Sequence, residues 1–251
     1  RADPVLQDGK IFYPVYSSKT WTSKTILLSK EDIEHLIALY DESITNADTL
    51  IEVLLTEVEK LGIGKKTLIV FTSEHGDMFG KHGRFMRGGP LRGTFYDDVL
   101  HVPLIIKHPK LKPRRLDGLV GHVDLAPTLL YFLGLPQLPN ASGKSLTSMI
   151  TDGKEVNEYI FAGSEFTPNA NNTYFSQRTR IETVRNKEWK LLKETFFESS
   201  QSAKPREMIE LYDIQNDKEE LNNFADNKTF KQIRTDLETK LDSWSEEVRK
   251  P

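Results

Sequence analysis

The chain has 251 residues, of which 37% are hydrophobic and 28% are charged, and its formal net charge is −3. These proportions are typical of a globular protein with a substantial core, and the small negative charge gives no reason to expect nucleic-acid binding. The absence of cysteine excludes disulfides, thiolate metal sites and a cysteine nucleophile. No apolar run approaches the roughly 18 residues of a transmembrane helix, so we expect no membrane span.

The first part of the chain predicts an irregular segment followed by a long helix. Residues 1–28 mix aromatic and polar side chains without a clear period, and we expect them to be irregular. From Lys30 to Leu61 apolar residues recur at helical spacing, which predicts either one long helix or two helices with a break within residues 43–48. Ser29 is a candidate N-cap with Asp32 at the capping-box position, and Gly62 is a candidate stop.

An apolar run then ends abruptly in a cluster of polar residues, Ser73-Glu-His-Gly-Asp77. The run Leu68–Phe71 is short and uniformly apolar, so we expect a buried strand of a parallel sheet. Ligands bind beyond the carboxyl ends of such strands. A carboxylate and an imidazole at this place can hold a divalent cation, which makes Glu74 and His75 candidate metal ligands; a solvated surface turn is the alternative.

The rest of the chain predicts a functional loop, then one strand and one helix, and finally a group of short strands followed by a helix. Residues 75–98 form a glycine-rich, basic loop of a length that is usually functional. A strand over Val102–Ile106 and a helix over Asp124–Leu133 follow, with Asp124 as N-cap and Gly134 as stop. Beyond Lys154 we expect short strands at Tyr159–Ser164, Arg180–Val184, Glu188–Glu194 and Met208–Tyr212, and then an amphipathic helix within Leu221–Val248 whose apolar face carries Phe230, Ile233, Leu237, Leu241 and Trp244.

Four segments resemble, in order, the C-terminal half of the sulfatases, a family of the alkaline-phosphatase superfamily. They are Ser73–Asp77 with Gly80–Gly83, Tyr96–Pro109, Val123–Leu130 with Gly134-Leu135, and Leu211–Asp217 with Glu220–Asn223. The resemblance implies an α/β fold. Residues 1–153 would form part of a sheet sandwiched by helices, and residues 154–251 a small α+β subdomain with an antiparallel sheet and a terminal helix.

The resemblance also implies roles for particular residues in hydrolysis of a sulfate ester. Glu74, where the family usually has Asp, and His75 would bind a divalent metal, with Ca²⁺ favoured and Mg²⁺, Mn²⁺ or Zn²⁺ as alternatives. His82 would assist proton transfer, and His122 would approach the substrate. The family lysine that contacts the ester oxygens has no counterpart here. Counting from Glu74 puts Arg87 in its place, and the register of Tyr96–Pro103 puts Arg92 there.

Other family features are missing from this chain. The nucleophile motif, Cys-x-Pro-x-Arg or Ser-x-Pro-x-Arg, which yields formylglycine, does not occur, nor does the N-terminal aspartate pair. We expect them in an N-terminal half of the same enzyme, and we expect this chain alone to be inactive on the sulfate ester of a small molecule or carbohydrate. The resemblance suggests a periplasmic, secreted or lysosomal location, although the sequence itself does not reveal the compartment. A phosphodiesterase or phosphonate monoester hydrolase, favoured by His75, and a non-catalytic protein that binds sulfated glycan are the alternatives.

Overall fold

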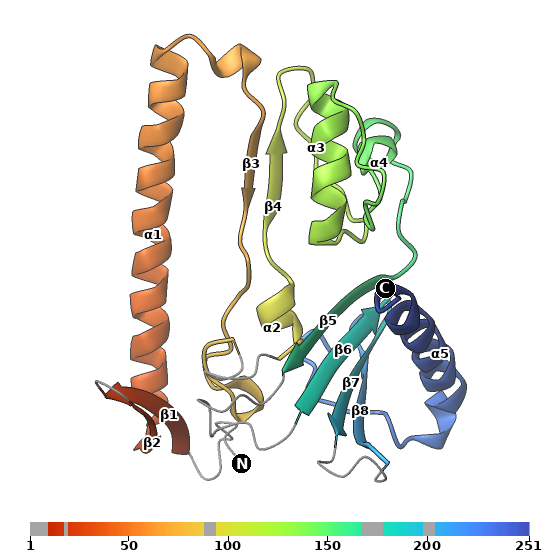
Figure 1. The fold of residues 1–251 in the computed structure, drawn as a ribbon. Coiled ribbons are helices and arrows are strands. Elements are labelled where there is room, and N and C mark those ends of the chain that lie inside the picture. The colour runs from red at the N-terminus through yellow and green to blue at the C-terminus, as the bar shows by residue number, and fades with distance from the viewer. Residues whose placement is uncertain (1–9, 18–19, 88–93, 167–177, 198–203, 251) are drawn as a thin grey trace. The chain divides into compact units, whose positions relative to one another are not determined.

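The computed structural model describes residues 10–17, 20–87, 94–166, 178–197 and 204–250 (Figure 1). The chain divides into two compact units, residues 1–113 and residues 114–251, each of which is described by itself. The family resemblance implies a division into residues 1–153 and 154–251, and this division stays a prediction.

The first unit opens with a β-hairpin. Strand β1 (Lys10–Ser17) pairs antiparallel with β2 (Thr20–Leu27), so the expectation of an irregular segment is wrong. Pro14 lies opposite Ser23 inside this ladder. A proline is tolerated there because a two-stranded sheet has only outer edges, where a backbone position without an N–H group can face away from the partner strand.

Helix α1 (Lys30–Lys60) is continuous, and its ends follow the predicted signals. The Ser29 backbone N–H donates to the Asp32 carboxylate at 2.8 Å, and the Asp32 N–H donates to Ser29 Oγ at 3.1 Å, which completes the capping box. Gly62, at φ 70°, takes the left-handed conformation that ends the helix. No break occurs within residues 43–48.

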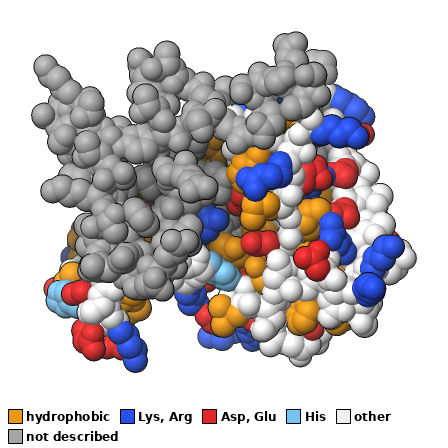
Figure 2. All heavy atoms as spheres, turned by 90° about the horizontal axis from the view of Figure 1, so that it is seen from below, with side chains coloured by type: hydrophobic (Ala, Val, Ile, Leu, Met, Phe, Trp, Pro, Cys, Tyr) orange, Lys and Arg blue, Asp and Glu red, His pale blue; other side chains and the backbone are white. Residues whose placement is uncertain are grey.

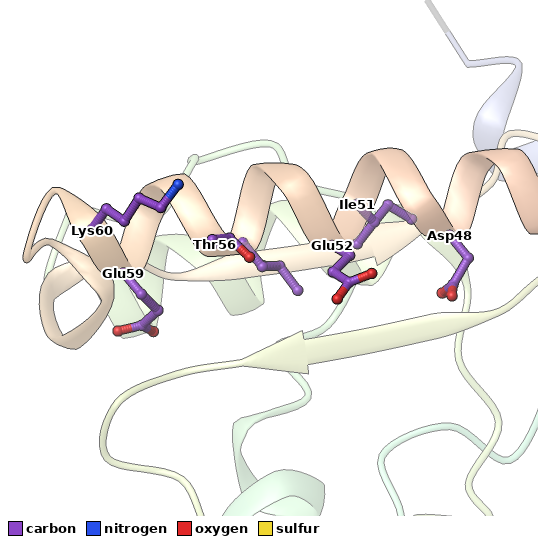
Figure 3. Close-up of a pocket in the computed structure, with 7 residues that line it drawn as sticks. Asp48, Ile51, Glu52, Thr56, Glu59 and Lys60 are labelled. Carbon is purple, nitrogen blue, oxygen red and sulfur yellow. The ribbon is translucent and has the colours of Figure 1, made fainter.

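Much of the apolar surface of α1 is exposed in this chain. The exposed fraction is 70% for Leu50 and 62% for Leu54. A groove of about 550 Å³ runs along the helix. Figure 3 shows Asp48, Glu52 and Glu59 extending from one side of α1, whereas Lys60 points away from that side. The side chains that line the groove are Asp48, Ile51, Glu52, Leu55, Thr56, Glu59 and Lys60.

The short turn η1 (Gly64–Lys66) leads into strand β3 (Ile69–Thr72), which pairs with β4 (Leu104–Lys107). The pairing is antiparallel, and Phe71 lies opposite Ile105 with exposed fractions of 40% and 60%. The prediction of a buried strand in a parallel sheet is therefore wrong for the described residues. The chain segment that connects β3 to β4 contains the turn η2 (Lys81–Gly83) and helix α2 (Asp97–Leu100).

The second unit begins with the turn η3 (His122–Asp124). Helix α3 (Leu125–Leu133), which the sequence predicted, comes next. Helix α4 (Thr147–Asp152) follows, and the sequence pattern did not predict it. Gly134, at φ 66°, ends α3 as expected. Asp124 is the N-cap residue of α3, as predicted, but its carboxylate makes no capping hydrogen bond to that helix.

Asp124 instead joins three segments of this unit. Its buried carboxylate accepts hydrogen bonds from the backbone N–H groups of Gly121 (2.9 Å) and Lys144 (2.8 Å) and from Asn157 Nδ2 (2.7 Å). Its carbonyl oxygen accepts from Thr128 Oγ1 at 2.6 Å. A carboxylate with several donors in a buried place fixes the loops that supply them.

The remainder of this unit is an antiparallel sheet with a helix packed on it. Strands β5 (Ile160–Phe166), β6 (Arg178–Arg185), β7 (Trp189–Phe197) and β8 (Arg206–Asp213) lie in sequence order, which confirms the four predicted strands. After the turn η4 (Lys228–Phe230) comes helix α5 (Lys231–Val248), which begins ten residues after Leu221, the first residue of the predicted range. Its predicted apolar face packs on Val184, Leu191 and Leu211 to form the core.

A buried ion pair links β7 to the segment after β8. Lys190 Nζ lies 2.7 Å from Glu220 Oε1, and the two side chains are 0% and 1% exposed. Elsewhere, charged side chains of both signs are interspersed on the face shown in Figure 2. None of the helices in the described part of the chain is both long and apolar enough to cross a lipid bilayer.

Candidate metal centre

The candidate ligands Glu74 and His75 lie just after the end of β3, with Ser73 between the strand and Glu74. The next residue, Gly76, donates its backbone N–H to the Val99 carbonyl of α2 at 2.9 Å. A Cβ atom at Gly76 would overlap the Asp98 carbonyl oxygen. Glycine is therefore required for the loop to lie directly on α2, and this contact sets the position of the two preceding side chains.

Glu74 and His75 present their side chains together. Glu74 Oε1 lies 3.9 Å from His75 Nε2, and the side chains are 84% and 32% exposed. His75 Nδ1 lies 3.0 Å from the Gly76 carbonyl oxygen. Because a carbonyl oxygen can only accept, Nδ1 carries the proton in the neutral ring, and Nε2 is left with the lone pair that a metal ligand needs.

The pair fits part of a cation shell. Its carboxylate oxygen and imidazole nitrogen suit a hard or borderline divalent ion, and they lie on the same side of the backbone. In the parts of the chain that the structure describes, no group of three or more His, Asp or Glu side chains gathers. Since Ca²⁺ and Mg²⁺ take about six oxygen donors, the two residues need donors from elsewhere.

Arg87 lies beside this pair, with its Nη1 atom 3.5 Å from His75 Nε2. Its guanidinium therefore stands close to the place where a metal and an anionic ester would meet. Asp77 does not hold the imidazole, because the partner of Nδ1 is the Gly76 carbonyl. Burial raises the pKa of the Asp77 carboxyl, and electrostatic interactions with His75 and Arg87 oppose that rise.

His82 belongs to a strained part of the same loop. Phe79, His82 and Met86 all have positive φ angles, of 44°, 52° and 57°. For side chains with a Cβ this conformation costs free energy, and it persists where the surrounding contacts fix it. The His82 ring is stacked on Tyr96, with centroids 3.8 Å apart and planes 4° from parallel.

The loop is tied to the rest of its unit by contacts that the motifs did not reveal. Met78 is fully buried, and Lys81 Nζ lies 2.8 Å from Asp98 Oδ1 on α2. The backbone N–H of Met78 donates to the Met86 carbonyl at 2.7 Å. Asp98 and Tyr96 both lie in the segment Tyr96–Pro109, which is one of the family motifs in the sequence. The motif did not indicate that these two side chains hold the loop.

The positions of two predicted site residues relative to this pair are not described by the structure. Arg92 lies outside the described residues. His122 lies in the second unit, at the first residue of η3, where it is exposed. Their roles stay predictions. The structure brings together Glu74, His75 and Arg87, and it places His82 in the same loop.

Two family models match the chain. The model described as "Sulfatase" matches residues 4–135, and the model described as "N-sulphoglucosamine sulphohydrolase, C-terminal" matches residues 80–247. The curated relatives include Arylsulfatase K of Mus musculus, 29% identical in an alignment of 241 positions that covers 92% of this chain and 39% of that protein. They also include the uncharacterized sulfatase YidJ of Escherichia coli (strain K12), 25% identical over 74% of this chain and 34% of that protein.

Solved structures with the same fold include BT4656 in complex with its substrate D-glucosamine-2-N,6-O-disulfate. It is 24% identical, with a TM-score of 0.64 over 81% of this chain and 39% of that one. Another is the phosphonate monoester hydrolase SpPMH from Silicibacter pomeroyi, 25% identical with a TM-score of 0.69 over 84% of this chain and 41% of that one. The chain spans about 40% of the length of these proteins. Because one family model covers most of its length, the chain belongs to the sulfatase family, within the alkaline-phosphatase superfamily, and matches the C-terminal region of that family.

Proposed function

We propose that the chain is the C-terminal portion of a metal-dependent sulfatase that hydrolyses sulfate esters. The observation that carries this proposal is the joint presentation of Glu74 Oε1 and His75 Nε2, with Nδ1 bonded to the Gly76 carbonyl. The match to the sulfatase models supports the reaction class. The substrate complex of BT4656 supports a sulfated carbohydrate as the class of substrate.

Glu74 and His75 would hold the cation, for which Ca²⁺ is the first choice. A bound divalent cation supplies Lewis-acid polarisation of ester oxygens. Arg87 would neutralise the non-bridging sulfate oxygens through its fork of N–H donors, with Arg92 as the alternative. His82, held in place by Tyr96, would give a proton to the leaving oxygen. His122 would contact the substrate. The formylglycine nucleophile and the remaining metal donors would come from the N-terminal half of the enzyme.

The test is hydrolysis of an aryl sulfate by the full-length protein and its variants. Glu74→Gln removes the charge of the carboxylate ligand, His75→Gln removes the imidazole nitrogen, and both keep the side chain comparable in size. We expect each to lower kcat/KM roughly 100-fold or more, because metal polarisation contributes several kcal/mol to transition-state stabilisation. His35→Gln and Glu42→Gln on exposed faces of α1 are the matched controls and should retain activity. Full activity in the Glu74 and His75 variants would rule the proposal out.

Hydrolysis of phosphorus esters is the second candidate activity. It is favoured by His75, and its structural support is the likeness to SpPMH. Both reactions use a cation and an arginine to neutralise a tetrahedral oxyanion, so the site residues do not separate them. The full-length protein should be assayed with an aryl sulfate, an aryl phosphonate monoester and a phosphodiester. A higher kcat/KM for the phosphorus esters would favour the second candidate.

The exposed apolar face of α1 and the pair Phe71 and Ile105 are proposed to contact the N-terminal half of the enzyme. Large exposed apolar patches of this kind mark contact surfaces. Leu50 and Leu54 lie on this face. Amide hydrogen exchange in α1 should be slower in the full-length protein than in this chain. Equal exchange rates in both would contradict this arrangement.

A further inference from the structure

Two arginines at the start of β6 share one carboxylate and one aromatic ring in the unit of residues 114–251. Arg178 Nε lies 2.5 Å from Glu165 Oε1, and Arg180 Nη2 and Nε lie 3.0 and 3.1 Å from Glu165 Oε2. Both guanidinium groups lie over the ring of Phe197, at 4.5 and 5.0 Å from its centroid. These four residues, from three adjacent strands, are called the arginine platform below.

The arginine platform carries more positive charge and more donors than its own carboxylate uses. Two guanidinium groups face one carboxylate, which leaves a net charge of about +1. Each guanidinium has five N–H donors, and Glu165 engages one donor on Arg178 and two on Arg180. Within the described part of the chain, Glu165 is the one acceptor that these two groups have. Donors therefore remain for a second anion.

The platform is also ordered in advance and partly shielded from water. Stacking on Phe197 holds both guanidinium planes, which reduces the entropy lost when an anion binds. The Arg180 side chain is 16% exposed and that of Arg178 is 46% exposed, so Arg180 is partly buried and Arg178 can reach a ligand. Attraction between charges is stronger in such a partly buried place than at a fully exposed one.

We propose that the arginine platform binds an anionic group, a sulfate or carboxylate, of an acidic oligosaccharide. The saccharide part of this proposal rests on the proposed function. The anion would take the free N–H donors of Arg178 first, since that side chain is the more exposed. Glu165 competes for the same two guanidinium groups and weakens the site. The hydrogen bond from Arg178 keeps the pKa of Glu165 below its usual value, so this competing carboxylate is charged at neutral pH.

A purely structural ion pair makes a different prediction for Glu165. If the two arginines only tie β5 to β6, removing the carboxylate charge would loosen the tie and leave ligand binding unchanged or weaker. If they bind an external anion, the same change frees donors and strengthens binding. Glu165→Gln therefore separates the two explanations by the sign of its effect.

The experiment is calorimetric titration of the full chain with a sulfated glucosamine-containing disaccharide in the presence of EDTA. Chelation removes any metal contribution, so the result does not depend on Glu74 and His75. We expect Arg178→Gln to raise Kd roughly tenfold, as loss of one charge-assisted hydrogen bond predicts, and Glu165→Gln to lower Kd. The unsulfated disaccharide should not bind measurably.

Arg206→Gln is the matched control. Arg206 stacks on Phe196, with its guanidinium 4.4 Å from the ring centroid, and it lies on the opposite face of the same sheet end because adjacent residues of a strand point to opposite faces. Arg206→Gln removes one positive charge, as Arg178→Gln does, but from outside the arginine platform. If the platform is specific, Arg206→Gln should therefore change Kd by less than about twofold. Equal weakening by Arg178→Gln and Arg206→Gln, no strengthening by a folded Glu165→Gln variant, or equal binding of the unsulfated disaccharide would each overturn the proposal. Thermal unfolding of every variant establishes that it is folded.

Discussion

Replacing Gly76 by alanine should destabilise the loop that carries the candidate metal ligands. The added Cβ would overlap the Asp98 carbonyl oxygen, which is backbone and cannot move away by changing a rotamer. The loop and α2 would have to separate, which would lengthen the 2.9 Å hydrogen bond from the Gly76 N–H to the Val99 carbonyl. Overpacking of this kind costs about 1–3 kcal/mol, and loss of the hydrogen bond costs about 1 kcal/mol more.

The assay is urea unfolding of the full chain, followed by intrinsic fluorescence. Gly121→Ala is the control, because a Cβ there would meet its nearest neighbour, Val123 Cγ2, at an ordinary contact distance of 3.5 Å. We expect the free energy of unfolding to fall by about 2–4 kcal/mol for Gly76→Ala and by less than about 1 kcal/mol for Gly121→Ala. Equal free energies of unfolding for the two variants would refute the close contact between the loop and α2.

Three further predictions concern stability. Lys190→Met should lower the free energy of unfolding by about 3–5 kcal/mol, since it leaves the Glu220 carboxylate buried without its cation; a loss below about 1 kcal/mol would contradict a buried ion pair. Asp124→Ala should lower the free energy of unfolding by about 3 kcal/mol or more, because it leaves buried hydrogen-bond donors without an acceptor. Amide hydrogen exchange at Lys144 should become faster, and unchanged exchange there would count against the described network. Because the folded pKa of Glu165 is lowered, its contribution is complete above the ordinary value near 4.5 and disappears as the pH falls through the lowered pKa. Glu165→Gln should accordingly flatten the acid side of the stability profile, and an unaltered profile would contradict the pairing with Arg178.

The sequence predicted the elements whose signals are local. Ser29 and Asp32 marked the start of α1, and Gly134 marked the end of α3, because capping bonds and left-handed glycines act within a few residues. The apolar face of α5 was also predicted, since Leu237 and Leu241 recur at helical spacing.

The wrong predictions concern contacts between distant parts of the chain. The apolar run before Thr72 indicated a strand but not the direction of its partner, because a uniform run carries no period that distinguishes parallel from antiparallel pairing. Residues 1–28 mix aromatic and polar side chains without a clear period, so the pairing of β1 with β2 was not predicted. Asp124 stands where an N-cap is expected, yet its partners Lys144 and Asn157 come from segments that no local pattern connects to it.

The sequence motif identified the candidate ligands, whose metal binding stays a prediction, but it did not identify the residues that hold their loop in place. Glu74 and His75 belong to a motif, and the structure brings their donor atoms together. The proximity of Arg87 to His75 depends on how the strained loop folds back, with Met78 buried and His82 stacked on Tyr96. Such packing is set by the tertiary structure and leaves no spacing that can be read in advance.

We propose above all that a cation binds between the Glu74 carboxylate and His75 Nε2. Paramagnetic Mn²⁺ tests it most directly, because it broadens the NMR signals of the nuclei nearest to it. Titration of the full chain with Mn²⁺ should broaden the imidazole signals of His75 before those of the exposed His35, and Glu74→Gln should remove this selectivity. Equal broadening of both histidines, or selectivity that survives in the Glu74 variant, would contradict the claim.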